Sequence, residues 1–363
     1  MIALQILVFL LSIGLVGITL LSAVRVLVLP RGAQDPVAFT TFITTRRLFM
    51  LLLRFAGSFD RRDAIMAYYA PISLLTLLPV WLTLVLLAYA GLFWATGIDA
   101  PYGAFVLSGS SLFTLGFASD NTLTHMVLSF TEATIGLILV ALLIAYLPTI
   151  YTAFSARENA VRMLDVRAGT PPSVVELISR AYRIGKLESL GSFWSEWEKV
   201  FAQIEESHTS LPALVFLRSP LPTQSWVTAA GCVLDSAAFI RSSVDIHHDA
   251  NADLCIRAGY LALRRIAAYF GIDYPADPHF PAEPISISHE EYAAVYDRLQ
   301  EAGVPMKADR EQAWHDFAGW RVNYDRVLLR LCAITMAPEA PWSSDRAPVL
   351  ELPTLSRWRI KAR

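Results

Sequence analysis

Long apolar runs dominate about the first 155 positions of the chain, and three of them are long enough to cross a membrane. They cover about residues 2–29, 69–96 and 124–154, and the first contains a single charge, Arg25, near its end. A hydrocarbon core about 30 Å thick is spanned by about 20 helical residues. The pattern therefore predicts three transmembrane helices. The first run lacks a basic start and is longer than the apolar core of a usual secretory signal, so we interpret it as a membrane helix.

A shorter apolar segment and a polar loop separate the second and third runs. Residues 102–113 predict a helix too short to span, and residues 114–120 form a polar turn before the third run. Irregular backbone is tolerated at membrane depth only where protein buries it or where it lines a watery path. Residues 67–155 are therefore predicted to form a pore domain with an outer helix, a re-entrant pore helix, a filter loop and an inner helix.

Charges between these runs predict the orientation in the cell (inner) membrane. The connector at residues 31–66 contains six arginines against three aspartates: Arg31, Arg46, Arg47, Arg54, Arg61 and Arg62 against Asp35, Asp60 and Asp63. The loop between the second and third runs contains Asp99 and Asp120 and no basic residue. The positive-inside rule then places the connector in the cytoplasm and the loop outside. The N-terminal helix, residues 1–30, begins outside, and the domain at residues 156–363 is cytoplasmic.

Within the connector, large apolar residues alternate with arginines. The apolar positions are Phe39, Phe42, Ile43, Leu48, Phe49, Leu51, Leu52 and Phe55. This pattern is typical of an interfacial amphipathic helix whose arginines face anionic headgroups of the lipid bilayer. The alternative is a cytosolic helix that packs on the C-terminal domain.

Residues 156–363 have the composition of a soluble domain, although the whole chain is 55% hydrophobic and 17% charged with a mean hydropathy of +0.45. Helical periodicity recurs at about 172–187, 192–206, 224–243, 250–270, 290–301 and 311–336, so we predict an all-α cytosolic domain. Its tryptophans at helical spacing, Trp194, Trp197, Trp314 and Trp320, are interpreted as core residues.

Candidate chemistry is sparse in this domain. No glycine-rich nucleotide fingerprint follows a strand, and no nucleophile–base grouping is present, so neither a resident cofactor nor an enzymatic activity is predicted. Two clusters are interpreted as solvated turns and caps, with a cation site as the alternative: His247, His248, Asp249 and Asp253, and His289, Glu290 and Glu291. The three cysteines, Cys232, Cys255 and Cys332, are interpreted as reduced, partly buried thiols. A net charge of −2 gives no argument for nucleic acid. An unidentified cytosolic ligand or protein partner is left open.

The loop after the short helix contains a sequence motif that resembles one from a known protein family. Residues 113–118, Phe-Thr-Leu-Gly-Phe-Ala, resemble the selectivity filter of potassium channels, whose usual form is Thr-Val-Gly-Tyr-Gly followed by Asp. The resemblance covers about residues 69–158, a two-helix pore, and it implies a homotetramer that conducts potassium or another monovalent cation. The conducting filter would be Thr114, Leu115, Gly116, Phe117 and Ala118. Such filters replace water around the ion by rings of backbone carbonyls.

Two of the departures from the usual filter matter for its geometry and charge. Ala118 stands where a second glycine is expected, and a left-handed backbone there costs about 1–2 kcal/mol. Ser119 stands where the aspartate usually follows, while Asp120 is one residue late and is a candidate for a ring of charge at the outer mouth. Its alternative is an ordinary turn residue. Phe117 is expected to pack behind the filter as the usual tyrosine does. Strict potassium selectivity is therefore in doubt.

The third apolar run contains further candidates. An ionisable side chain in an apolar helix usually faces protein or water, so Glu132 is predicted to brace the filter through Ser108, Ser110 or Ser111; the alternative places it in solvent at headgroup level. Gly136 and Pro148 are candidates for a hinge or gate, Gly136 having close packing as its alternative.

The residues support two functions from different classes. The first is a tetrameric cation channel. The second is a non-conducting membrane scaffold or sensor that keeps the pore fold and binds a partner through its cytosolic domain, which Ala118 and Ser119 favour.

Overall fold

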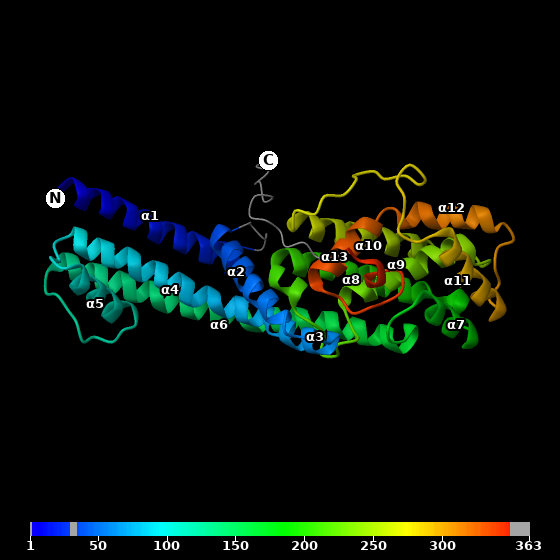
Figure 1. Cartoon of the computed structure of the whole chain (residues 1–363), viewed down its shortest axis with the longest axis horizontal. Helices are drawn as coiled ribbons and strands as arrows, with labels where there is room; N and C mark the ends of the chain where they lie inside the picture. Colours follow the sequence, from blue (N-terminus) through cyan, green and yellow to red (C-terminus); the bar gives the residue numbers. More distant parts are fainter. Residues whose placement is uncertain (1, 30–34, 349–363) are drawn as a thin grey trace. The chain divides into compact units, whose positions relative to one another are not determined.

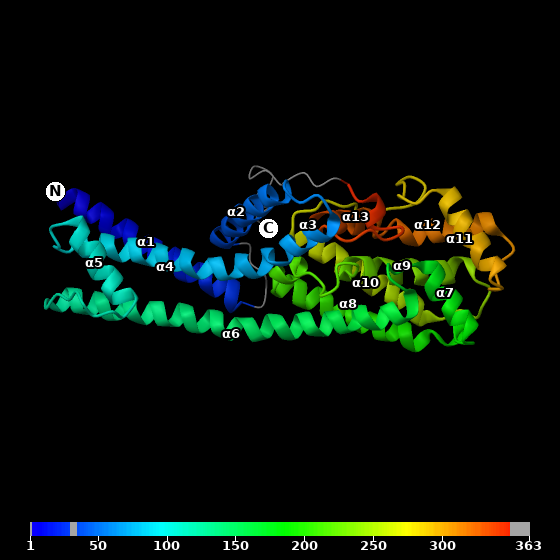
Figure 2. The ribbon, with the colours of Figure 1, turned by 60° about the horizontal axis from the view of Figure 1, so that its bottom comes forward.

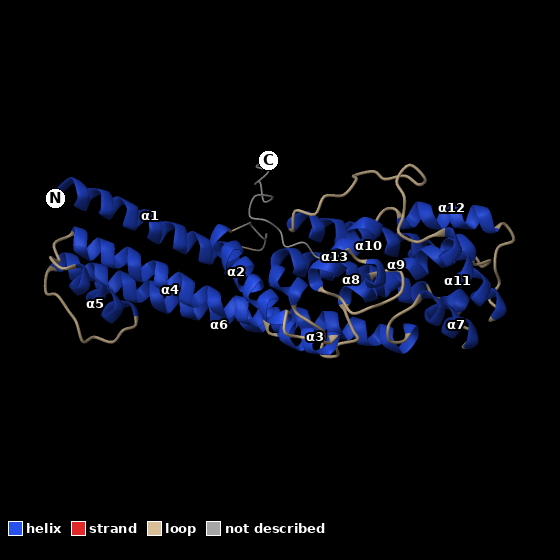
Figure 3. Cartoon of the chain, in the orientation of Figure 1, coloured by secondary structure: helices blue, strands red, loops and turns tan. Residues whose placement is uncertain are grey.

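The structure, a computed structural model, describes residues 2–29 and 35–348. Contacts divide the chain into two compact units, Met1–Thr152 and Ala153–Arg363, called unit 1 and unit 2 here. Across the described ranges every regular element is helical, apart from an isolated bridge between Val244 and Met306 (Figure 3). The prediction of an all-α protein is confirmed. Arg31, counted in the basic connector, lies outside the described residues.

Unit 1 is built around α4. Its helices are α1 (Ile2–Leu27), α2 (Pro36–Leu53), α3 (Phe59–Ala67), α4 (Tyr69–Ala95), α5 (Pro101–Leu112) and α6 (Leu123–Ala168), the last continuing into unit 2. Helix α4 packs along α1 and also contacts α2 and α5 (Figure 1). Its buried face includes Leu77, Trp81 and Phe93, each with no exposed surface.

Four helices are long and apolar enough to cross a membrane by length and composition, rather than the predicted three: Ile2–Leu27, Pro36–Leu53, Phe59–Ala95 and Leu123–Ala168. The additional candidate is α2, which we predicted to be interfacial. Its 18 residues are about 27 Å long at 1.5 Å per residue, which is close to the hydrocarbon thickness. Arg46 and Arg47 lie near its middle. Helix α2 therefore meets the length criterion although it contains two charges.

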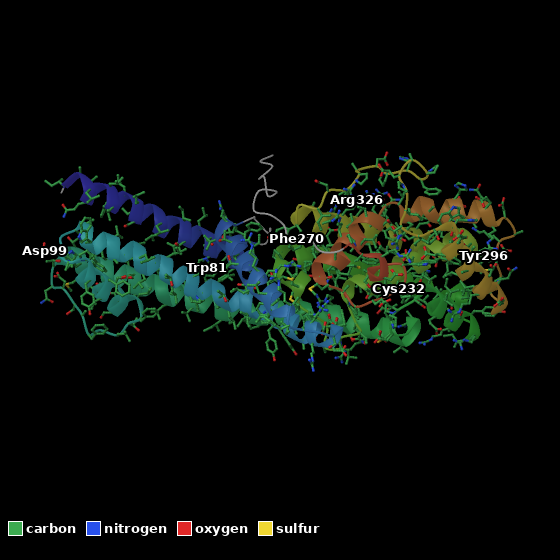
Figure 4. All side chains as sticks on the ribbon, in the orientation of Figure 1. Trp81, Asp99, Cys232, Phe270, Tyr296 and Arg326 are labelled. Atoms are coloured by element: carbon green, nitrogen blue, oxygen red, sulfur yellow. The ribbon has the colours of Figure 1, made fainter. Side chains whose placement is uncertain are left out.

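A buried polar network joins three helices of unit 1. Asp35 caps α2 by accepting a hydrogen bond from the amide of Ala38 at 2.9 Å, and its other contact is the Ser22 hydroxyl of α1 at 2.7 Å. Trp81 of α4, which is labelled in Figure 4, donates through Nε1 to the Ser22 hydroxyl at 2.9 Å. This network fixes the start of α2 against α1 and α4.

Helix α6 is longer than the apolar pattern predicted. It was expected to end near residue 154, but it runs for 46 residues to Ala168. The polar residues from Ser155 to Glu158 end the apolar segment without breaking the helix, because charged side chains are good helix formers. Within unit 2, Arg157 donates to the carbonyls of Leu214 at 2.7 Å and Leu217 at 2.8 Å.

Unit 2 surrounds a central helix, α9, which is buried along nearly its whole length. The helices are α7 (Val174–Arg183), α8 (Gly191–Ser210), α9 (Trp226–Ser243), α10 (Ala250–Tyr269), α11 (His289–Glu301), α12 (Arg310–Arg321) and α13 (Asp325–Thr335). Short 3-10 turns are η1 (Leu187–Ser189), η2 (Pro212–Phe216) and η3 (Ser344–Arg346). The core tryptophans are largely confirmed: Trp194, Trp197 and Trp314 are buried and Trp320 is partly buried. The cysteines are free and buried.

The helix expected over residues 311–336 is two helices, α12 and α13. The chain turns between them at Asn323, whose side-chain amide donates to the Gly319 carbonyl at 3.0 Å. Arg264 of α10 donates to the Asn323 carbonyl at 2.8 Å, so that carbonyl is held by a tertiary contact. The periodicity continues across a break that a neighbouring helix stabilises.

Candidate functional site

The candidate site begins where α5 ends. The amide of Thr114 donates to the Ser111 carbonyl at 3.0 Å, and the amide of Leu115 donates to the Ser110 carbonyl at 2.8 Å. These two bonds are the Schellman motif, which requires a left-handed residue at the first position after the cap. That residue is Thr114, with φ of 54°. A β-branched residue in this conformation is an outlier, and such strain is found most often at functional positions.

The strain expected at Ala118 is therefore not found there. The described non-glycine residues with positive φ are Thr114, Met336 and Trp342, so the strain prediction for Ala118 was wrong. Gly116, with φ of 73°, does use its conformational freedom. The energetic cost of a left-handed backbone falls on Thr114, because the end of α5 requires that conformation at this position.

Ser110 holds the far end of the loop. Its hydroxyl donates to the Ala118 carbonyl at 3.0 Å and accepts from the Ala118 amide at 3.0 Å. The carbonyl of Ala118 is thus directed toward α5, unlike that of a residue lining a filter. The structure in this respect departs from the prediction that Ala118 continues the carbonyl row, because a nearby hydroxyl on α5 competes for the carbonyl.

Four consecutive carbonyls lie between these two fixed points. Within residues 2–29 and 35–348, the carbonyl oxygens of Thr114, Leu115, Gly116 and Phe117 accept no hydrogen bond. The side chain of Phe117 is 70% exposed, so it does not pack behind the loop of its own chain as expected. The loop presents backbone acceptors and apolar side chains outward.

Glu132 of α6 lies against α5. Its side chain is fully buried, and the Ser108 hydroxyl donates to Oε1 at 2.5 Å. The same hydroxyl lies 2.9 Å from the Leu86 carbonyl of α4, so the contact joins three helices; Figure 2 shows α5 between α4 and α6. The second carboxyl oxygen, Oε2, has no hydrogen-bond partner among the described residues.

The three serines predicted as partners of Glu132 have different roles. Ser108 makes the contact, Ser110 binds the loop at Ala118, and Ser111 donates to the Leu107 carbonyl of its own helix at 2.9 Å. Ser110 lies two residues from Ser108, about 200° around α5, and so faces another neighbour, whereas the hydroxyl of Ser111 is taken up by a carbonyl of its own helix. The assignment of Ser110 and Ser111 to the brace of Glu132 was therefore wrong.

Asp120 is held at the end of the loop. Its Oδ1 accepts from the Thr122 amide at 2.8 Å and hydroxyl at 2.6 Å, and lies 3.0 Å from His125 Nδ1. These hydrogen bonds, those from Thr122 first, lower the pKa of the Asp120 carboxyl to about 2. The other ring nitrogen of His125 lies 3.1 Å from the Thr96 hydroxyl. Asp120 is thus a turn residue that also places negative charge beside the loop, whereas Ser119 is simply exposed.

Gly136 has a packing role that is visible in the structure. A Cβ built there would lie 2.9 Å from the Leu112 carbonyl oxygen and 2.9 Å from Leu112 Cδ1, so α5 ends directly on this glycine. Helix α6 is continuous through Gly136 and Pro148. The close-packing alternative accounts for Gly136, and a hinge at either residue stays a prediction.

Sequence reasoning missed the partners that hold these groups, namely Leu86, Thr96, Thr122 and His125. For Thr122 and His125 the sequence did offer a signal, because His125 lies in the first turn of an apolar helix a few residues after Asp120. In unit 2, no cluster of three or more metal-ligating side chains is found in the described residues. Comparisons with protein-family models, with curated proteins and with solved structures find no match for this chain.

Proposed function

We propose that this chain is the subunit of a homotetrameric channel for potassium or another monovalent cation, with a pore similar to that of potassium channels. The observation that carries the proposal is the row of four carbonyls from Thr114 to Phe117, which accept no hydrogen bond in the described chain. The row is fixed at one end by the terminus of α5 and at the other by Ser110.

Four copies are needed because one loop cannot surround an ion. Closed rotational symmetry would bring four loops around one axis and create rings of carbonyl oxygens that replace the hydration shell. In this assembly α5 is the re-entrant pore helix, α4 the outer helix and α6 the inner helix. Asp120 supplies negative charge at the outer mouth, and unit 2 lies in the cytoplasm.

The proposed filter is shorter than the usual one. Because Ser110 binds the Ala118 carbonyl, we expect each chain to supply four carbonyls and no fifth. Fewer rings give fewer sites at which potassium and sodium are distinguished. We expect weak discrimination between potassium and sodium in the native protein. Reversal potentials in mixed gradients measure this discrimination, and strong native selectivity would contradict the short filter.

Ion flux through purified protein in liposomes tests the function. The informative variant is Ser110→Ala, which releases the loop, and its matched control is Ser111→Ala, which removes a hydroxyl bonded only within its own helix. We expect native flux, at least a tenfold loss in Ser110→Ala and little change in Ser111→Ala.

The oligomeric state is measured on the same preparation by native mass spectrometry. A stable monomer or two-fold dimer would contradict the channel. An intact tetramer without flux would favour the alternative, a membrane scaffold or sensor that keeps the pore fold.

A further inference from the structure

One face of α2 and the turn after it exposes large apolar side chains. Leu48, Leu51, Leu52 and Phe55 are 58%, 50%, 52% and 86% exposed. Their spacing of three and four residues places them along one side of the helix. Burying such surface is worth roughly 25 cal/mol per Å², and contiguous exposed patches of this kind mark interaction sites. We call these four residues the apolar face of α2.

The opposite side of α2 is already occupied. Phe49 and Leu53 are each 7% exposed, and the ring of Phe49 meets that of Tyr69 of α4 edge-on at 5.9 Å. Arg46 is also turned inward, with its guanidinium 5.8 Å from the Tyr69 ring centre. Since Asp35 ties the start of the helix to α1 and α4, the apolar face is presented by a fixed element.

Exposed arginines accompany the apolar face: Arg47 and Arg54 adjoin Leu48 and Phe55 in the sequence, and Arg61 lies in the next helix, α3. Arg47, Arg54 and Arg61 are all exposed, and the described part of the chain contains no hydrogen bond or ion pair made by their side chains. The neighbouring Arg46 shows that position in the helix, and not residue type, decides which arginine is buried. Apolar surface flanked by unpaired cations is complementary to an anionic lipid surface.

We propose that the apolar face of α2 lies in the acyl boundary of the cytoplasmic leaflet and that Arg47, Arg54 and Arg61 bind the phosphates of anionic phospholipids. The opposite side of the same helix packs against α4, and α2 also contacts α1; both α1 and α4 are long and apolar enough to span the bilayer. A second copy of the same face is a poor partner because its arginines repel. The inference uses the predicted orientation of the chain but does not require that it conducts ions.

Lipid retention by the full-length protein tests the charge contacts. The protein is prepared in detergent with phosphatidylglycerol or phosphatidylcholine, and bound lipid is counted by native mass spectrometry. We expect the protein to prefer phosphatidylglycerol. Each basic residue near an anionic surface contributes about fivefold to lipid affinity. The triple variant Arg47→Gln, Arg54→Gln, Arg61→Gln should therefore weaken the preference about a hundredfold. Added inorganic phosphate should not replace the lipid, because it lacks the acyl chains.

The matched control removes the same charge elsewhere. Arg298, Arg326 and Arg330 are exposed on unit 2, and their joint change to Gln should leave lipid preference unaltered. Equal losses in the two triple variants would show that net charge alone is responsible and would overturn the proposal. Because lipid retention is read without flux, a failed channel assay does not affect this result.

Depth is measured at the apolar face itself. Leu52→Cys is labelled with an environment-sensitive fluorophore, the three native cysteines being buried. In phosphatidylglycerol vesicles we expect the emission of the label to be blue-shifted and the label to lie at a shallow depth in the bilayer. In the arginine triple variant the blue shift should be lost. A label at the bilayer centre would show that α2 spans the membrane, and a water-exposed label would show that the face contacts no lipid. Either result would overturn the proposal.

Discussion

Two buried acids, one in each unit, are stabilised in opposite ways. Glu132 in α6 has a single hydroxyl partner for Oε1, and its Oε2 lacks a partner in the described chain. Asp235 in α9 of unit 2 binds Arg321 Nη1 through both oxygens at 2.6 and 2.7 Å, and accepts from the Tyr324 hydroxyl at 2.8 Å. Both carboxyls are almost completely buried.

The network in unit 2 is extended by a second acid. Arg321 also donates to Asp325 at 2.7 Å and to the Trp342 carbonyl at 2.8 Å, while Asp325 accepts from Ser286 at 2.7 Å. Burial by itself lowers the pKa of Arg321, but Asp235 and Asp325 outweigh it and raise the pKa above its usual value. A buried ion group of this kind stabilises a fold only when every charge is paired.

The two acids depend on different properties of their surroundings. In unit 2 the acid needs an opposite charge, because a lone buried charge costs several kcal/mol. In the apolar part of unit 1 the partner is a neutral hydroxyl, so the contact depends on shape and hydrogen bonding. Substitutions that keep shape but change charge should therefore separate the two sites.

The largest effect is expected at Arg321. Changing Arg321→Met leaves Asp235 and Asp325 as unpaired buried carboxyls and should lower the free energy of unfolding of unit 2 by about 3–5 kcal/mol. Denaturant unfolding of the full chain in detergent measures this. The control is Arg326→Met at an exposed position, where a change within about 0.5 kcal/mol is expected. Equal effects at the two positions would mean that the ion network is not stabilising.

A smaller effect is expected at Glu132. Glu132→Ala leaves the Ser108 hydroxyl without this partner, which should cost about 1–3 kcal/mol and weaken the proposed tetramer or its proposed ion flux. Glu132→Gln keeps the shape and a hydrogen bond, so its loss should be clearly smaller. Thermal stability of the reconstituted assembly and flux are both recorded. If Ala and Gln variants behave alike, the brace between α5 and α6 does not exist.

Thr114 should show a stabilising change that reduces function. Thr114→Gly relieves the left-handed strain at the end of α5 and should stabilise unit 1 by up to about 1 kcal/mol. The same change removes the Thr114 hydroxyl of each copy, which would lie at the inner end of the proposed filter, so flux or selectivity should fall. Thermal unfolding and flux on one preparation separate the two effects, and lower stability in the glycine variant would contradict the strain at Thr114.

The smallest effect concerns acid pH at the loop. The pKa of Asp120 is lowered to about 2 from an ordinary value near 4, so its contacts contribute fully above pH 4 and are lost as pH falls toward 2. The protection of the Thr122 amide against hydrogen exchange, taken relative to the intrinsic exchange rate at each pH, should therefore fall over that window. In Asp120→Asn this acid dependence should vanish, and an unchanged profile in the variant would assign it to another group.

Much of this protein is determined by its sequence alone. The apolar runs predicted α1, α4, α5 and α6, and the periodicity of the second half predicted a helical unit whose core contains Trp194, Trp197 and Trp314. These features follow from local rules, since a run of apolar residues or a repeat of 3.6 residues has the same meaning in any chain. The position of Glu132 in an apolar helix was also enough to indicate a polar neighbour.

Other features were decided by the tertiary structure. Which serine of α5 meets Glu132 depends on the rotation of that helix between α4 and α6. The strain lies at Thr114 because the end of α5 fixes it there, and α12 ends where Arg264 from another helix holds the chain. These outcomes depend on contacts between residues far apart in sequence. The local propensity of a segment does not indicate which distant residue its side chains will contact.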